Sequence, residues 1–151
     1  MANSNFVRGA LIRGDLCPSS YSGMTKTYAV AAGDNVAMFL GDFVKPTGES
    51  ATINGVSYPV CTQAAATDTI CGIATSFSFM PTNPTLLYRL ASTARLVTVN
   101  IDSFVVFEIQ MNGTPASGDV DNNMDIVVAA GNTVNGFSGM QLDRSTIGAA
   151  S

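Results

Sequence analysis

Short apolar segments separated by turn signals run along most of the chain. From Thr27 onward they alternate with Gly, Asn, Asp and Pro about every eight to twelve residues, a spacing typical of a β-sandwich or β-barrel. The pattern predicts strands or strand regions at the following positions: Thr27–Ala31, Val36–Leu40, Phe43–Val44, Ala51–Ile53, Val56–Val60, Ile70–Met80, Leu86–Tyr88, Arg95–Ile101, Val105–Gln110, Asp125–Ala130 and Gly139–Leu142.

The clearest local signal is the Asn54-Gly55 pair, which separates two of these segments. Both residues can adopt a positive φ, as the type I′ turn of a β-hairpin requires. Helical periodicity is nearly absent. Only Gln63–Asp68, with three alanines, favours a single helical turn. The stretch Lys45–Gly48 contains Pro and Gly and is expected to interrupt the strand pattern.

These signals predict an all-β, single-domain fold, an antiparallel β-barrel or sandwich over residues 28–151. Residues 1–27 are rich in Ser, Asn and Gly, and we expect them to form an extended N-terminal arm with little core of its own. The arm is either a frayed tail or a segment that orders on a partner. Its apolar patch supplies candidate partner-binding residues: Phe6, Val7, Leu11 and Ile12.

Composition points towards a protein that works through its surface. Charged residues make up 12% of the 151 residues, about half of the roughly 25% that is usual for soluble domains. A hydrophobic content of 46% argues against disorder. A weakly charged surface repels its neighbours weakly, which suits a protein that packs against others.

The charge pattern and the cysteines limit the classes of partner and the cellular compartment that we expect. The net charge is −4 and the seven basic residues are scattered, so nucleic-acid binding is not expected. No apolar run approaches the ~20 residues of a membrane span. The N-terminus lacks a signal core, so we expect synthesis in a cytoplasm. Three cysteines, Cys17, Cys61 and Cys71, are expected to be reduced apolar filler.

Candidate catalytic chemistry is sparse. The chain has no histidine, which removes the commonest general base and the Ser–His and Cys–His pairs. No Gly-rich phosphate loop is present. Asp102 and Glu108 are the carboxylates considered as an acid and base, but both fit a turn or a solvated face. We therefore predict a protein that is not an enzyme and has no cofactor.

One acidic cluster deserves comparison with a calcium loop. Oxygen ligands occur at alternate positions in Asp119, Asp121, Asn123 and Asp125, as they do where an EF-hand loop begins. The sixth position is Met124 rather than Gly, and the twelfth is not Glu. Because Asp and Asn are also ordinary turn formers, we favour an acidic turn without metal, and calcium binding is the alternative.

Two segments resemble a family of small structural proteins from tailed phages. Leu87–Val97 carries a Tyr-Arg-x-Ala-Ser-Thr-Ala-Arg-like stretch, and Phe107–Gln110 follows as Phe-Glu-x-Gln. Members of this family are similar in both motifs and are usually head decoration or cement proteins. Further matches, within residues 28–146, lie at these positions: Ala32–Asp34, Phe39–Lys45, Gly72–Ile73 and Ser138–Asp143.

The resemblance implies a virion protein on the capsid exterior that binds the major capsid protein and bridges its subunits. A homotrimer is implied, with a dimer as the alternative, and neither nucleic acid nor membrane is a partner. Arg89 and Arg95 lie in the matched segment. They either pair inside the domain, with Asp102 or Glu108, or contact an acidic capsid surface, and we keep them as candidate partner-binding residues.

Other function classes also fit a chain without catalytic residues. A tail, fibre or head-completion subunit would share the same composition. A small-ligand or carbohydrate-binding β-domain would need an apolar pocket or exposed aromatic residues. Trp is absent and there are four Tyr, so sugar stacking has weak support.

Overall fold

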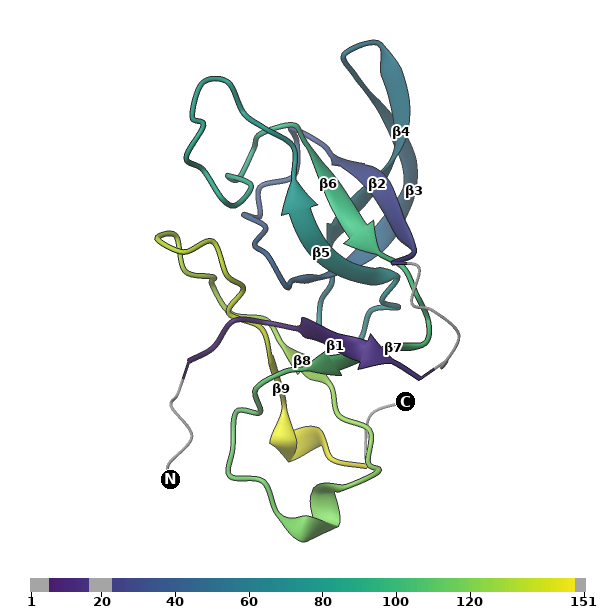
Figure 1. Cartoon of the computed structure of the whole chain (residues 1–151), viewed down its shortest axis with the longest axis vertical. Helices are drawn as coiled ribbons and strands as arrows, with labels where there is room; N and C mark the ends of the chain where they lie inside the picture. The colour runs from purple at the N-terminus through teal and green to yellow at the C-terminus, as the bar shows by residue number, and fades with distance from the viewer. Residues whose placement is uncertain (1–5, 17–22, 149–151) are drawn as a thin grey trace.

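Five strands close into a small barrel in the computed structural model, which describes residues 6–16 and 23–148 (Figure 1). Around the barrel they follow the order β2 (Thr25–Val30), β4 (Val56–Gln63), β3 (Phe43–Ile53), β5 (Gly72–Phe77) and β6 (Arg95–Asn100). Neighbouring strands are antiparallel except for β2 and β4, which run parallel. The all-β prediction is therefore confirmed, and the barrel form is closed with mixed strand directions.

The barrel interior is filled by alternate residues of its strands. On β6, Val97 and Val99 are fully buried, and on β2 Tyr28 and Val30 point to the same interior. Successive side chains of a strand point to opposite faces, so this alternation directs one set inward. The remaining members of the first core cluster are Met38, Val44, Cys61 and Ala74.

Two short strand pairs lie below the barrel in Figure 1, and we call them the lower strand pairs. In the first, β1 (Leu11–Asp15) is antiparallel to β7 (Val105–Glu108). In the second, β8 (Ile126–Val127) is antiparallel to β9 (Gln141–Leu142). Two 3₁₀ turns, η1 (Ser117–Asp119) and η2 (Arg144–Thr146), complete this part.

A second core cluster joins the lower strand pairs to the outside of the barrel. Its buried members are Ala10, Phe43, Ala64, Ile73, Ile126 and Met140. Ile12, Phe107, Ile109 and Leu142 pack against it while partly buried. Phe43 and Phe107 meet edge to face, with ring centroids 6.0 Å apart. The barrel wall therefore has an apolar cluster on each side.

Main-chain contacts fix the junction between the two parts. The N–H of Ala10 donates to Gly41 O at 3.0 Å, and the N–H of Gly41 donates to Ala74 O on β5 at 2.9 Å. Gly41 has a φ of +87°, and a Cβ there would lie 2.9 Å from Arg8 O. Only glycine tolerates both conditions, so this residue allows the N-terminal segment to pack on the barrel.

Several predicted boundaries differ from the structure. The hairpin at Asn54-Gly55 is confirmed, with both residues at positive φ. Instead of ending at Lys45–Gly48, strand β3 continues through this stretch, because a register shift between Pro46 and Ser50 absorbs the irregularity. Gln63–Asp68 forms no helix; it contains the end of β4 and a turn.

Two predicted strands, Val36–Leu40 and Leu86–Tyr88, belong instead to loops. The two loops meet at a single bridge between Met38 and Arg89. Their apolar residues resemble those of strands, but Met38 and Phe39 are buried by loop contacts rather than by a ladder, and Val36 and Leu87 stay exposed.

The described part of the predicted arm over residues 1–27 belongs to the strand framework. It supplies β1, which pairs with β7, and the first residues of β2, which pair with β6. Cys17 lies outside the described residues. In the described part of the chain, no helix is long and apolar enough to cross a membrane.

Candidate functional site

The predicted partner-binding patch of the N-terminal segment packs against the chain itself. Phe6 is 49% exposed and meets Phe137 edge to face, with ring centroids 6.5 Å apart. Val7 and Leu11 are half-buried, and Ile12 packs on the second core cluster. Of these four, Phe6 keeps the most surface for a partner.

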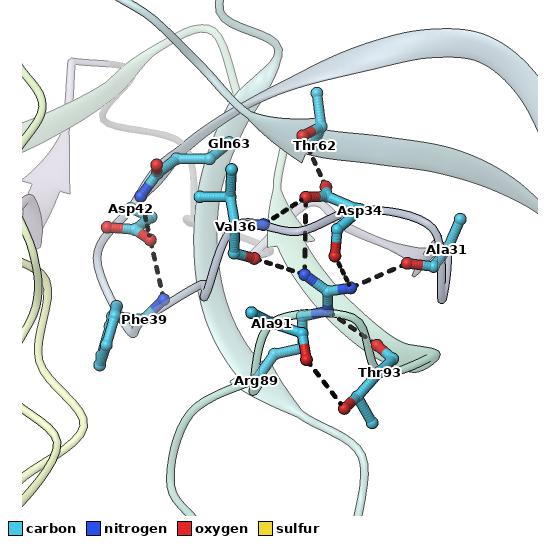
Figure 2. A network of polar contacts seen from close by, with 10 residues as sticks. All are labelled: Ala31, Asp34, Val36, Phe39, Asp42, Thr62, Gln63, Arg89, Ala91 and Thr93. Carbon is cyan, nitrogen blue, oxygen red and sulfur yellow. Dashed lines mark hydrogen bonds and ion pairs between the residues drawn. The ribbon is translucent and has the colours of Figure 1, made fainter.

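Arg89 is fully buried and holds two loops together (Figure 2). Its guanidinium donates to the carbonyl oxygens of Ala31, Asp34, Val36 and Thr93. It also lies 3.7 Å from the Asp34 carboxylate. Burial is the main influence on the Arg89 guanidinium and lowers its pKa, which Asp34 partly offsets. The structure thus corrects the placement of Arg89 on a partner-binding surface, because its donors are used inside the fold.

Arg95 has a similar internal role. It is 5% exposed, and its guanidinium donates to the carbonyl oxygens of Ser78, Tyr88 and Leu86. It also lies over the Phe77 ring, 5.5 Å from the centroid. Arg95 is therefore also unavailable to a partner.

The internal partners of both arginines differ from the predicted Asp102 and Glu108. Loop carbonyls have no ladder partner, and burying them unpaired is costly. A planar guanidinium with five donors can satisfy several of them at once. Because this requirement arises only when distant loops meet, no pattern along the chain indicates it.

The acidic turn with the calcium-like spacing is organised by a basic residue. The Asp119 carboxylate accepts from Arg144 Nε at 2.8 Å and from the Ala116 N–H at 2.7 Å. The Arg144 hydrogen bond lowers the pKa of Asp119. Asp121 has a φ of +62° and is exposed, while the main-chain N–H of Asp125 donates to Thr146.

These contacts fasten the turn to the segment around η2. Asn123 contributes through its main-chain oxygen, which accepts from Gly148. Within residues 6–16 and 23–148, no three His, Cys, Asp or Glu side chains are grouped to hold a metal ion. The four candidate ligands therefore form a turn whose first carboxylate is already used by Arg144.

Segments that are distant in the sequence form a groove that the sequence pattern does not predict. The groove has a volume of about 410 Å³ and lies between the loop before β3 and the loop after β8. Its lining is mostly apolar and uncharged: Val36, Ala37, Phe39, Gln63, Val128, Ala129, Ala130, Gly131 and Thr133. The two sides come from segments some ninety residues apart, so only the folded chain creates it.

Buried polar groups hold one wall of this groove (Figure 2). Asp42 Oδ2 accepts from the Phe39 N–H and from Gln63 Nε2, both at 2.8 Å. The Phe39 ring stacks on Tyr88, with centroids 4.7 Å apart and planes 11° apart. A Cβ on Gly131 would lie 2.3 Å from the Phe39 ring. The wall is therefore fixed on several sides before any ligand arrives.

A second apolar surface lies on the β3–β4 hairpin. From the pair Ser50–Pro59 to the turn, this ribbon has no further strand paired to it among the described residues, and Figure 1 shows it projecting past the barrel. Residues directly opposite in an antiparallel pair share a face. The register therefore places Ala51, Ile53, Val56 and Tyr58 on one face, and Ser50, Thr52, Ser57 and Pro59 on the other.

We call the first set the apolar ribbon face. Val56 is 50% exposed, and its three companions are half-buried. An isolated two-stranded hairpin is only marginally stable in water. A projecting ribbon with one apolar and one polar side is the geometry expected of a surface that packs against something else.

The two described cysteines are poor nucleophiles. Cys61 is fully buried in the barrel, where burial raises the pKa of its thiol to about 12. Burial also raises the pKa of Cys71. Since the thiolate is the reactive form, both behave as apolar filler at neutral pH.

Comparison with known proteins adds no relative. No protein-family model matches the chain, and no match was found among curated proteins or among solved structures.

Proposed function

We propose that this protein is a capsid cement protein of a tailed phage. It binds the outside of the major capsid protein lattice and stabilises the head by bridging subunits. It is made in the host cytoplasm and assembles on the virion, as a homotrimer or, alternatively, a dimer. The resemblance of Leu87–Val97 and Phe107–Gln110 to phage decoration proteins supports this family of functions.

The observation that carries the proposal is the apolar ribbon face. It projects past the barrel, is bordered by few charges, and is suited to lie across a neighbouring protein. Stable interfaces bury roughly 1,600 Å² in total, so the ribbon must be joined by further apolar surface. The groove beside Phe39 and the exposed Leu87 are other apolar surfaces of the same chain, which suits a protein that bridges several subunits. Many modest contacts repeated over a shell resist internal pressure through multivalency.

Paired substitutions on the two ribbon faces test this proposal. Ile53→Thr with Val56→Thr removes apolar contact area but keeps β-branched residues in the strands. We expect at least a tenfold loss of affinity for shells of the major capsid protein, equivalent to about 1.4 kcal/mol. The melting temperature of the free protein should change by less than about 2 °C, since both residues lie outside the two cores.

The matched control is Thr52→Ser with Ser57→Thr, a cross-strand pair on the polar face. It should decorate shells like the wild type. If both double variants occupy shells equally, the apolar ribbon face is not part of the contact with the capsid. If wild-type protein is missing from purified virions by mass spectrometry, the cement proposal itself is rejected.

A different virion role, in the tail, fibre or head completion, can be distinguished from the cement role by the number of copies of this protein in each virion. Hundreds of copies per particle support cement, and a handful support the alternative.

A small-ligand-binding β-domain is favoured by one observation, the groove of about 410 Å³. This volume lies within the range of roughly 300–1,000 Å³ that is usual for small-molecule sites. Saturable binding of a small apolar ligand, lost in Gly131→Ala because the Phe39 ring would be displaced, would support that function.

A further inference from the structure

Asp42 occupies the junction between the barrel and the lower strand pairs. It follows Gly41, whose carbonyl accepts from the N-terminal segment, and it has no exposed surface. Its own carbonyl accepts from the Ala74 N–H on β5 at 2.9 Å. Two residues before it, Leu40 exchanges main-chain hydrogen bonds with the segment that leads to β9. A change at Asp42 therefore reaches every element that meets here.

The two carboxylate oxygens of Asp42 have different surroundings (Figure 2). Oδ2 accepts from Phe39 N and from Gln63 Nε2, each at 2.8 Å. Oδ1 is buried and has no hydrogen-bond partner. The nearby Ser138 hydroxyl stabilises the charged form of the carboxyl and so lowers its pKa. It makes no hydrogen bond of normal geometry with Oδ1. A buried ionised carboxylate with one free oxygen is costly.

Among residues 6–16 and 23–148, no cation is among the groups that shift this carboxyl. The groups that favour its charged form are the Ser138 hydroxyl, the Phe39 N–H and the Gln63 amide, and all three are neutral. The N-terminal segment presents Gly9 here, and β5 contributes main chain. None of these groups titrates, and no charged side chain of the described residues is among those that shift Asp42. Burial outweighs the three donors and raises the pKa of Asp42.

We propose that Asp42 is a proton-operated latch. With a proton on its carboxyl, the junction between the barrel and the lower strand pairs is closed. Loss of the proton loosens the junction, because the resulting charge is stabilised by water that can enter only when the packed segments separate. The proposal is independent of the cement function.

The direction of the pH effect follows from the sign of the shift. In the unfolded chain the carboxyl has its ordinary pKa near 3.8, and in the folded protein the pKa is higher. Folding therefore favours the protonated form. The stabilisation is complete below the ordinary value and is lost as the pH rises through the raised pKa. This is opposite to a surface carboxylate that is paired with an arginine.

Direct titration of the Asp42 carboxyl carbon by ¹³C NMR is the first test. It requires no substitution and so avoids any folding defect. We expect a midpoint above 3.8, with backbone shifts at the junction following the same curve. A midpoint at or below 3.8 would overturn the proposal.

The second test compares melting curves of Asp42→Asn and wild type over about pH 4 to pH 8. Asparagine keeps an oxygen for the Phe39 and Gln63 donors and cannot ionise. As the pH rises, the wild type should lose melting temperature relative to the variant. Each tenfold change in the folding equilibrium corresponds to about 1.4 kcal/mol and to a shift of roughly 3–5 °C for a chain of this size.

The matched control is Asp102→Asn, since Asp102 Oδ1 also accepts a main-chain N–H, from Phe104. It should leave the wild-type pH profile unchanged. Parallel profiles for wild type and Asp42→Asn would overturn the latch.

Hydrogen exchange tests where the loosening occurs. The amides of Ala10 and Ser138 cross the junction, donating to Gly41 O and Leu40 O. After correction for hydroxide catalysis, their exchange should accelerate with pH in the wild type and not in Asp42→Asn. The amides of β6 should stay protected in both. Uniform acceleration over the whole chain would indicate global destabilisation and would contradict a latch at the junction.

Discussion

The barrel and the lower strand pairs each bury an apolar cluster, but their backbones are connected differently. β2 and β6 align six consecutive residue pairs, from Thr25 opposite Asn100 to Val30 opposite Arg95. By contrast, β8 and β9 align only two pairs, and β1 and β7 are interrupted by a register shift between Ile12 and Gly14. The barrel is therefore closed around one long uninterrupted ladder, β2 with β6, and its other strand pairs are shorter or contain a register shift. The lower part has no ladder of that length among the described residues and is held by short pairs and loop contacts.

The two parts therefore differ in how their main-chain hydrogen-bonding groups are satisfied. A closed ladder satisfies main-chain groups strand by strand. The lower part satisfies them through isolated contacts, such as the Met111–Leu142 bridge and the bond from Asn112 N–H to Leu142 O at 2.9 Å. Such regions open locally at lower cost than the core of a ladder. We expect perturbations of the barrel to unfold the whole protein, and those below it to act locally.

The largest expected effect comes from Arg89 on the barrel side. Arg89→Met preserves much of the volume but leaves the carbonyls of Ala31, Val36 and Thr93 without their donor. We expect the free energy of unfolding to fall by about 4–5 kcal/mol, by analogy with the loss of one member of a buried ion pair. Urea denaturation measures it.

Arg13→Met is the matched control, because the Arg13 side chain is 54% exposed and its hydrogen bond within the described part of the chain goes to the exposed Glu108. A similar midpoint for both arginine variants would contradict the assignment of Arg89 as the tie between the loops.

Two buried methionines compare the parts directly. Met38 belongs to the barrel cluster and is 1% exposed, while Met140 belongs to the lower cluster and is 0% exposed. We expect Met38→Ala to cost about 3 kcal/mol and Met140→Ala about 2 kcal/mol, because short strands can close around a cavity more readily. Hydrogen exchange should show global loss of protection in the first and loss confined to β7–β9 in the second.

Reversed magnitudes, or global loss of protection in both variants, would show that the two parts form one cooperative unit.

The same contrast explains what the sequence could predict. The barrel strands have local signals: the β-branched alternation around Val97 and Val99, and the Asn54-Gly55 turn. Both predictions are confirmed in the fold, because both signals depend on neighbours along the chain. The parallel pairing of β2 with β4 has no such signal, since it depends on which edges meet when the barrel closes.

The candidate sites follow the same rule. The apolar ribbon face could be predicted from the hairpin, because an Asn-Gly turn fixes which residues lie opposite one another. The groove could not, because it needs Phe39 and Val128 from distant segments. The internal roles of Arg89 and Arg95 were equally hidden, as their acceptors are main-chain carbonyls that any residue could supply.

The smallest expected effect is at the surface of the lower part, where Glu108 of β7 meets two arginines. Arg13 Nε lies 2.6 Å from Oε2, and Arg8 lies 3.3 Å from Oε1. The hydrogen bond from Arg13 is the main cause of a lowered pKa at Glu108. Exposed pairs of this kind add little to stability. We therefore expect Glu108→Gln to fold normally at neutral pH, with slightly faster exchange of the β1 amides as its measurable sign.

The pH dependence of Glu108 has the opposite sign to that of Asp42. Its folded pKa is below the ordinary value of 4.5. The contribution is therefore present above that value and lost as the pH falls through the lowered pKa. Lowering the pH should therefore speed hydrogen exchange of the β1 amides in the wild type. In Glu108→Gln, where this exchange is already slightly faster, acid should cause no additional increase. If β1 exchange responds equally in both, β1 is held by its main-chain pairing and the apolar contact of Ile12 rather than by the ion pairs.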